Sequence, residues 1–342
     1  MTRRGVIVLL CTAALATASC TRNDHGASPS TSAKGLVESP AKQKKSPAPP
    51  YRVGSLVLDL VDHSRSTPSD GKAPGKPYRD LSTLVLYPAE GSPSAQVFQG
   101  APPDKQSGPF ALIVFAHGYG SDGAQYAPLL AQWAQAGFVV AAPTFPLSSG
   151  TAAGGPSLVD YEAQPGDLSF VLARVLALSR THTGALGGMI DPHRIAGVGH
   201  SLGAMTVLAW TEDTCCLDPL VDAAVVFDGV QAPFGKGSYF VGRTVPLLVL
   251  HGTSDKTLPY RGGQNIYADA KPPKFFVSLI GAPHTSFLQS FDQSLETPVW
   301  EHVDVQSVID FLALELDHRD SALESLDETA TVAGIARIAQ VP

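Results

Sequence analysis

The chain has 342 residues, of which 44% are hydrophobic and 16% charged, and its formal net charge is −7. This composition allows a sizeable buried core and excludes a globally disordered chain. A mildly acidic protein lacks the electrostatic attraction to polyanions on which nucleic-acid binding depends, so we expect no nucleic-acid partner.

The first 20 residues are typical of an export signal. Arg3 and Arg4 give a positive start, and residues 5–19 form an apolar stretch shorter than the roughly 20 residues of a spanning helix. Two alternative sites for cleavage of the signal are possible from the sequence. Ala16-Thr17-Ala18 suits an ordinary signal peptidase, whereas Thr17-Ala18-Ser19-Cys20 resembles a bacterial lipoprotein box. The protein is expected to be exported, either secreted or held at the cell surface by a lipid on Cys20, its one expected membrane contact.

The rest of the chain divides into three parts. Residues 21–50 are rich in Ser, Ala, Lys and Pro, which predicts a flexible linker. Strand-like and helix-like segments then alternate, which places one α/β domain at residues 51–318. Residues 319–342 are predicted to be a C-terminal tail, for which a loosely docked helix is one interpretation.

The predicted elements start with residues 53–61 and 81–87, whose side chains alternate between apolar and polar as in antiparallel strands. Residues 111–116 are continuously apolar, which is typical of a strand covered on both faces. Further strands are predicted at residues 138–142, 195–198, 223–227, 245–250 and 275–280, and helices at residues 124–136, 167–179, 204–210 and 303–314. The alternation predicts a mostly parallel central sheet with helices on both faces.

Ser201 lies in Gly199-His200-Ser201-Leu202-Gly203, between the strand at residues 195–198 and a helix that begins at Ala204. A serine in this position occupies a tight, strained turn, and the glycines on either side avoid collisions across it. The turn presents the hydroxyl above the sheet, so Ser201 is the candidate nucleophile.

A serine hydroxyl needs a base, and the base needs an orienting acid. Such groups collect where the parallel strands end. His284 follows the strand at residues 275–280 in a loop with glycine and proline, and is the predicted base. Asp255, which follows the strand at residues 245–250, is the favoured acid, and Asp228, which follows residues 223–227, is the alternative acid.

Two backbone N–H groups are the candidate donors to a developing oxyanion. One belongs to Leu202, directly after the nucleophile, and the other to Tyr119 in His117-Gly118-Tyr119-Gly120, after the strand at residues 111–116. We expect the histidines near these residues to hold loops by hydrogen bonds rather than to transfer protons; they are His117, His200 and His251.

These motifs together resemble the α/β-hydrolase family over most of residues 51–317. The likeness rests on the Gly-His-Ser-Leu-Gly turn, the His117 loop, His251-Gly252-x-x-Asp255 and Gly281-x-x-His284. Asp191-Pro192-x-Arg194-Ile195 is also typical of the family. The resemblance implies catalysis by Ser201, His284 and Asp255 through an acyl-enzyme, without a metal or an organic cofactor.

Within the family the chain looks like the bacterial lipase, dienelactone-hydrolase and platelet-activating-factor-acetylhydrolase-like branch. Val61-Asp62-x-Ser64-Arg65, Arg79-x-Leu81 and Leu86-Tyr87-Pro88 carry this closer likeness. Some acetylhydrolase relatives place their acid where this chain has Asp228. Cutinase-type polyester hydrolases share the order of serine, acid and histidine. The resemblance implies an exported serine esterase or lipase that acts on a small-molecule or polymeric carboxylic ester. Acyl transfer and polyester hydrolysis by the same residues stay open, and a non-catalytic binding lipoprotein is the rival.

The short gap between the strands at residues 223–227 and 245–250 leaves no room for a large cap domain. We therefore expect an open site roofed by residues 147–164 and 231–242. The candidate apolar walls are Trp133, Phe145, Phe234, Tyr239 and Phe287. The neighbours Cys215 and Cys216 form either a vicinal disulfide or two buried thiols.

Overall fold

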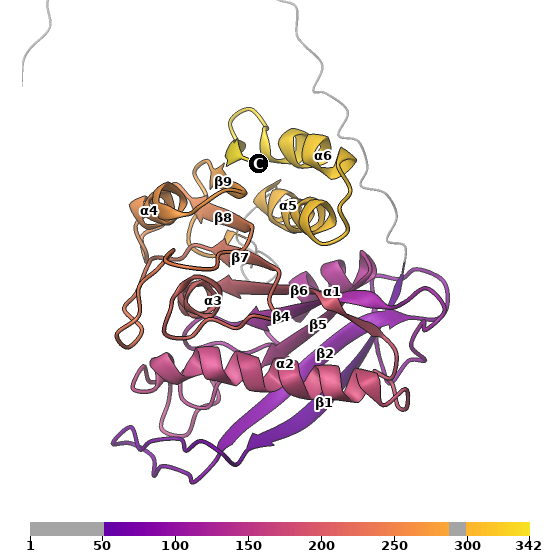
Figure 1. The fold of residues 1–342 in the computed structure, drawn as a ribbon, viewed down its shortest axis with the longest axis vertical. Helices are drawn as coiled ribbons and strands as arrows, with labels where there is room; N and C mark the ends of the chain where they lie inside the picture. Colours follow the sequence, from indigo (N-terminus) through magenta and orange to yellow (C-terminus); the bar gives the residue numbers. More distant parts are fainter. Residues whose placement is uncertain (1–50, 287–298) are drawn as a thin grey trace, which may run out of the picture. The chain divides into compact units, whose positions relative to one another are not determined.

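The computed structural model describes residues 51–286 and 299–342 (Figure 1). The predicted export signal, the linker, Cys20 and Phe287 lie outside the described residues. Within these two ranges, no helix is long and apolar enough to cross a membrane.

The described domain is built on one central sheet. Its strands are β1 (Arg52–Asp62), β2 (Arg79–Ala89), β3 (Val97–Gln99), β4 (Phe110–Ala116), β5 (Phe138–Pro143), β6 (Ile190–His200), β7 (Ala223–Phe227), β8 (Leu247–Gly252), β9 (Lys274–Leu279) and β10 (Ala336–Val341). Its helices are α1 (Ala127–Gln135), α2 (Gln164–Arg180), α3 (Leu202–Glu212), α4 (Arg261–Asp269), α5 (Val299–Glu315), α6 (Ser321–Ala330) and the short 3-10 helix η1 (Tyr161–Ala163).

The strand order across the sheet is β10-β9-β8-β7-β6-β4-β5-β2-β1-β3. The strands from β9 to β5 are parallel to one another, and β10 and β2 join this block antiparallel at its two sides. The carboxyl ends of the parallel strands therefore lie along one edge, and the loops that follow them are neighbours there. The predicted mostly parallel sheet is confirmed.

Helices cover both faces of the sheet (Figure 1). One apolar core packs α1, α5 and α6 against the sheet, and the other packs α2, α3 and α4 against the opposite face. In β4, Ile113 and Phe115 point into the first core, whereas Leu112 and Val114 point into the second. A strand buried on both faces needs apolar side chains at every position, which explains the unbroken apolar run that predicted it.

The C-terminal tail is a correction to the predicted domain boundary. α6 buries Leu326 and Ala330 in the core beside α5, and β10 pairs with β9 from Ala336 opposite Leu279 to Val341 opposite Lys274. The boundary at residue 318 is therefore wrong, because the following residues complete the sheet. The strand escaped prediction because β10 lies at the end of the sheet, where Ile338 is only partly buried and the apolar pattern is weak.

The connection from β7 to β8 contains no helix and no strand of the sheet, so no cap domain is inserted there, as predicted. A buried ion cluster fixes the connection from β5 to α2. The Arg79 guanidinium donates to both carboxylate oxygens of Asp167 at 2.6 Å and lies 2.9 Å from the carboxylate of Asp160. The cluster ties the end of this long loop to β2, whose first residues lie at the edge of the sheet where the parallel strands end.

Candidate functional site

Ser201 sits at the junction between β6 and α3, with φ 57° and ψ −119°. A positive φ is uncommon for a residue with a side chain, so the surrounding contacts must hold this turn. The Ser201 N–H donates to the carbonyl of Phe227 in β7 at 2.9 Å. A Cβ atom at Gly203 would lie 2.0 Å from the carbonyl oxygen of Ala116, so only glycine allows α3 to approach β4 this closely.

His284 lies between Ser201 and Asp255. Its Nε2 is 2.9 Å from the Ser201 hydroxyl oxygen, and its Nδ1 is 2.7 Å from Oδ2 of Asp255. Because a carboxylate can only accept, Nδ1 carries the proton in the neutral ring and Nε2 is free to accept the serine proton. The His284 side chain is 13% exposed, whereas that of Asp255 is fully buried. The three side chains thus form one continuous hydrogen-bonded chain.

Donors surround the carboxylate of Asp255. Its Oδ1 accepts the backbone N–H groups of Thr257 at 2.7 Å and Leu258 at 2.9 Å. Its Oδ2 faces His284 and also lies 3.3 Å from Nε2 of His251. Burial lowers the pKa of His251, which favours a neutral ring whose Nε2–H is shared between this carboxylate and the carbonyl of Leu258.

Asp228, the alternative acid, occupies a different environment. Its Oδ1 accepts the Gly252 N–H at 2.8 Å and lies 3.9 Å from Nε2 of His251, while Oδ2 makes no hydrogen bond to a described residue. Burial raises the pKa of this carboxyl well above its usual range. The Nδ1–H of His284 donates to Asp255 and not to Asp228.

The loop after β4 brings backbone donors next to the serine. The Gly118 N–H donates to the Tyr126 hydroxyl at 3.2 Å, and the Gly120 N–H donates to the carbonyl of Ser148 at 2.8 Å. The N–H of Tyr119, between them, donates to no described residue, and neither does that of Leu202 in the first turn of α3, where helical N–H groups lack partners within the helix. Neither predicted oxyanion donor therefore donates a hydrogen bond within the described residues.

The buried histidines on either side of the site are uncharged. Burial lowers the pKa of His117 to about 4 and that of His200 to about 3. His117 accepts the Phe145 N–H at Nε2, at 3.0 Å, and donates from Nδ1 to the carbonyl of Gly118. It therefore holds the loop after β4 against the loop after β5, which is the role expected from the sequence.

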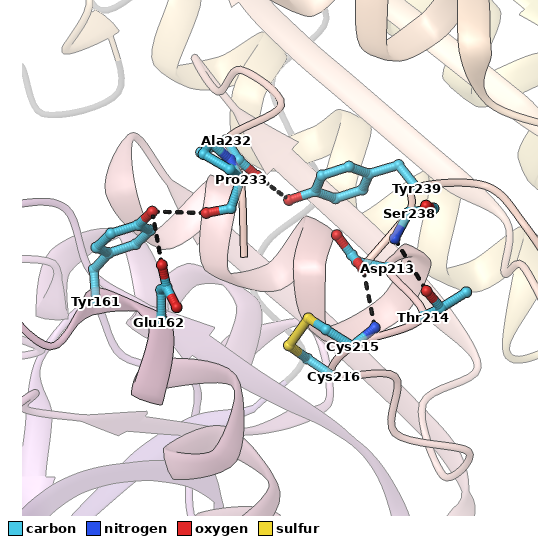
Figure 2. The surroundings of a disulfide bond; sticks show 10 residues. All are labelled: Tyr161, Glu162, Asp213, Thr214, Cys215, Cys216, Ala232, Pro233, Ser238 and Tyr239. Atoms are coloured by element: carbon cyan, nitrogen blue, oxygen red, sulfur yellow. Dashed lines mark hydrogen bonds between the residues drawn. A yellow bond between two sulfur atoms is a disulfide. The ribbon is translucent and has the colours of Figure 1, made fainter. Parts of the chain in front are cut away.

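The two predicted roof loops contact each other beside the site. The Tyr161 hydroxyl donates to the carbonyl of Pro233 at 2.6 Å, and the Tyr239 hydroxyl donates to that of Ala232 at 2.7 Å (Figure 2). These loops follow β5 and β7, so both start at the edge of the sheet that carries Ser201. The side chain of Tyr119 joins the first loop, because its hydroxyl donates to the carbonyl of Pro156.

Several predicted apolar walls prove to be core residues. Trp133 is fully buried and packs against Phe115 and Phe227 beneath the sheet, so its assignment as a wall is wrong. Phe145 is also fully buried and packs on His117. The pattern of residue types along a helix or a loop does not distinguish an aromatic residue that lines a cleft from one that fills the interior.

Cys215 and Cys216 form a disulfide, which resolves the alternative left open by the sequence (Figure 2). The bonded pair follows α3 and lies beside the loop after β7. Asp213 accepts the Cys215 N–H at 2.9 Å, and Thr214 and Ser238 exchange two hydrogen bonds. The cysteines thus belong to the junction between two loops rather than to the group around Ser201.

Among the described residues, two overlapping sets of side chains bring three metal-ligating atoms within 4.8 Å of one another: His200, Asp228 and His284, and Asp228, His251 and Asp255. Both nitrogens of His200 and both of His284 already make hydrogen bonds. Asp255 also accepts from His284 and from two backbone N–H groups. A metal ion would have to displace those bonds, so the donor sets fit a hydrogen-bonded network better than a metal centre.

Comparison with known proteins identifies the family. Residues 113–338, more than half of the chain, match the model of the alpha/beta hydrolase family. The chain belongs to the alpha/beta hydrolase family. No curated protein matches this hydrolase. Among solved structures, a ferulic acid esterase from Streptomyces cinnamoneus is similar, with 21% sequence identity and a TM-score of 0.65 over 86% of this chain and 98% of that one. At this identity the likeness supports the fold.

The structure brings together Ser201, His284 and Asp255, which the sequence had singled out, but sequence reasoning did not find Tyr126. The Tyr126 hydroxyl lies 2.7 Å from Nδ1 of His200, although the residues are far apart in sequence. A tyrosine at the start of a predicted helix gives no signal of such a contact, because only the folded sheet brings the two together.

Proposed function

We propose that this α/β hydrolase is a serine esterase that cleaves carboxylic esters through an acyl-enzyme. The observation that carries the proposal is the unbroken chain from the Ser201 hydroxyl through His284 to the buried Asp255, at 2.9 and 2.7 Å. A positioned base that contacts the serine and is itself oriented by an acid is the arrangement that nucleophilic acyl transfer needs.

In this mechanism Ser201 attacks the ester carbonyl while Nε2 of His284 accepts the hydroxyl proton. Asp255 holds the ring in the required tautomer and stabilises the imidazolium that forms. The N–H groups of Leu202 and Tyr119 donate to the oxyanion of the tetrahedral intermediate. His284 then returns the proton to the leaving alcohol, and a water molecule deprotonated by His284 releases the acid and regenerates Ser201.

The absence of an inserted domain between β7 and β8 supports an ester that needs no deep enclosure, either a small molecule or the end of a polymer. The similar fold of a ferulic acid esterase agrees with ester chemistry. Within the family, the motifs around Asp62, Arg79 and Pro88 favour the lipase, dienelactone-hydrolase and acetylhydrolase-like branch. Hydrolysis rates for p-nitrophenyl esters of graded acyl length would define the preferred length of the acyl chain.

The decisive experiment replaces Ser201 with alanine. We expect Ser201→Ala to abolish p-nitrophenyl acetate hydrolysis and labelling by a fluorophosphonate probe, which reacts only with an activated serine. Because the side chain lies at the turn between β6 and α3 and is only partly buried, the melting temperature should stay close to that of the wild type. Retained turnover or labelling in Ser201→Ala would exclude this serine as the nucleophile, and wild-type protein that resists the probe would exclude the function.

The export of the enzyme is part of the same proposal. Residues 1–20 carry the signal pattern, and Cys20 stands where a lipoprotein would be lipidated. If Cys20 carries lipid, the full-length protein should fractionate with membranes and Cys20→Ser should move it to the soluble fraction. A wild-type protein found wholly in the soluble fraction of exporting cells would favour cleavage after Ala18.

A further inference from the structure

We propose that Tyr126 and His200 form a positioning relay that fixes the oxyanion loop relative to the loop of His284. The inference rests on the serine esterase function proposed above and assigns roles to two residues that do not touch the ester. The relay runs from the backbone of Gly118, through both side chains, to the backbone of His284.

Three hydrogen bonds make up the relay. The Gly118 N–H donates to the Tyr126 hydroxyl oxygen at 3.2 Å. That hydroxyl lies 2.7 Å from Nδ1 of His200. On the other side of the ring, Nε2 of His200 lies 2.9 Å from the carbonyl oxygen of His284. Residues from the loop after β4, the start of α1, the end of β6 and the loop after β9 are thereby connected.

The position of every proton in the relay follows from its ends. A carbonyl oxygen only accepts, so Nε2 of His200 carries the hydrogen and donates to His284. Burial lowers the pKa of His200 to about 3, so the ring is neutral and its Nδ1 must accept from the Tyr126 hydroxyl. The oxygen of Tyr126 then accepts from Gly118. Only a neutral histidine with an acceptor at Nδ1 satisfies both partners.

Rigid elements hold both side chains. His200 is the last residue of β6, where its backbone pairs with Phe227 of β7, and its side chain is almost fully buried. Tyr126 precedes α1 and packs on Phe115 of β4, with ring centroids 4.8 Å apart. The relay therefore anchors the two loops to the sheet as well as to each other.

The loop after β4 lies tightly against this pair. A Cβ atom at Gly118 would come within 3.1 Å of both Nδ1 of His200 and the Tyr126 hydroxyl, and within 3.4 Å of the Ser201 Cβ. The next residue is Tyr119, whose N–H is the proposed oxyanion donor. A small movement of Gly118 therefore moves that donor relative to the nucleophile.

Loss of the relay should slow catalysis more than it weakens substrate binding. The donor at Tyr119 and the base at His284 act most strongly in the transition state, so misplacing them lowers kcat more than it raises KM. Complete removal of one oxyanion donor costs about 10²–10³ in kcat, so its displacement should cost less, about 10- to 100-fold. A residue with a purely structural role would change the melting temperature and leave kcat of the folded enzyme intact.

The first test is Tyr126→Phe, which removes the hydroxyl and keeps the buried ring. We expect kcat for p-nitrophenyl acetate to fall about 10- to 100-fold with KM within about twofold of the wild type. Tyr87→Phe is the matched control, because this buried tyrosine donates to the carbonyl of Ala101 near the end of β2 farther from Ser201. It removes an equivalent hydrogen bond and should leave kcat unchanged.

The second test is a double-mutant cycle with His200→Gln, whose amide can still donate to the carbonyl of His284 but which lacks the ring nitrogen Nδ1 that accepts from Tyr126. If the hydroxyl acts through His200, its loss in the His200→Gln background should lower kcat by less than about threefold. Additive effects, or a kcat in Tyr126→Phe within about twofold of wild type, would overturn the relay. In either case, fluorophosphonate labelling of Ser201 in the wild type would keep the esterase function standing.

Discussion

At the scale of single residues, burial determines which titratable groups near Ser201 can exchange protons. His117 and His200 are held neutral, with pKa values lowered to about 4 and about 3. Asp228 is buried and its pKa is raised well above its ordinary value. His284, by contrast, is partly exposed and contacts both the serine and a buried carboxylate. This difference in environment supports one base among several histidines.

The same isosteric change should have very different effects at the two carboxylates. Asp255→Asn removes the acceptor that orients His284 and should lower kcat about 10³- to 10⁴-fold. Asp228→Asn should lower kcat less than about threefold, because an amide resembles the protonated acid that burial favours and its oxygen still accepts the Gly252 N–H. Steady-state kinetics on both variants provide the measurement. A severe loss in Asp228→Asn with an active Asp255→Asn would reverse the assignment of the acid.

The buried side chain of Glu212, at the end of α3, should make the free energy of unfolding depend on pH. Its side chain is buried, and burial raises its pKa to about 8. Between pH 4.5 and about 8 the folded protein keeps this proton while the unfolded chain releases it, so the contribution to stability is lost as the pH rises through this window.

Glu212→Gln should remove this contribution. We expect the variant to be more stable than the wild type at pH 8, by roughly 1–4 kcal/mol, and the difference to shrink towards pH 5. Urea denaturation across this range gives the free energy of unfolding. Glu324→Gln on the exposed surface of α6 is the control and should follow the wild type. A difference between Glu212→Gln and wild type that does not change with pH would show that Glu212 ionises alike in both states.

At the scale of elements, the site depends on loops that are held to one another. The loop after β5 is joined to the loop after β4 by the Gly120–Ser148 hydrogen bond, and to the loop after β7 by Tyr161 and Pro233. The disulfide lies next to the last of these loops (Figure 2). The edge of the sheet is thus lined by segments whose order comes from contacts with their neighbours.

The disulfide should contribute little to global stability. It joins adjacent residues, so it closes a very small loop and removes little entropy from the unfolded chain. Replacing both Cys215 and Cys216 with serine should cost about 1 kcal/mol, compared with the 2–4 kcal/mol typical of disulfides that close long loops. Urea denaturation of the variant and of the oxidised wild type measures the difference. A loss above about 3 kcal/mol would mean that the bond organises the folded loop itself.

At the scale of the whole molecule, the described domain extends to the C-terminus. β10 covers the edge of β9, and α6 packs beside α5, so both complete the side of the sheet that carries the loop of His284. Uncovered strand edges promote aggregation. We therefore expect the residues after 318 to affect the site through the stability of β9.

Two truncations test this boundary. The fragment of residues 51–342 should fold and hydrolyse p-nitrophenyl acetate like the full-length protein, because the part before residue 51 supplies no predicted site residue. The fragment of residues 51–318 should be poorly soluble or melt at least 10 °C lower, because it exposes the edge of β9 and part of a core. Soluble, active protein from the shorter fragment would show that α6 and β10 are dispensable.

Local patterns along the chain were sufficient to predict several parts of this protein. Unbroken apolar runs marked the parallel strands, because a strand buried on both faces has no polar position. The glycines around Ser201 marked the tight turn, and the positions of Asp255 and His284 after later strands predicted that they would meet at one edge of the sheet.

Features that depend on contacts between distant segments became visible only in the folded structure. It distinguished Asp255 from Asp228, because both end a strand and only the folded loops show which carboxylate reaches His284. It also placed Trp133 in the core, joined Tyr126 to His200 and paired β10 with β9. Burial and hydrogen-bond partners are set by folding, because a pattern of residue types along the sequence does not give the distances between residues in space.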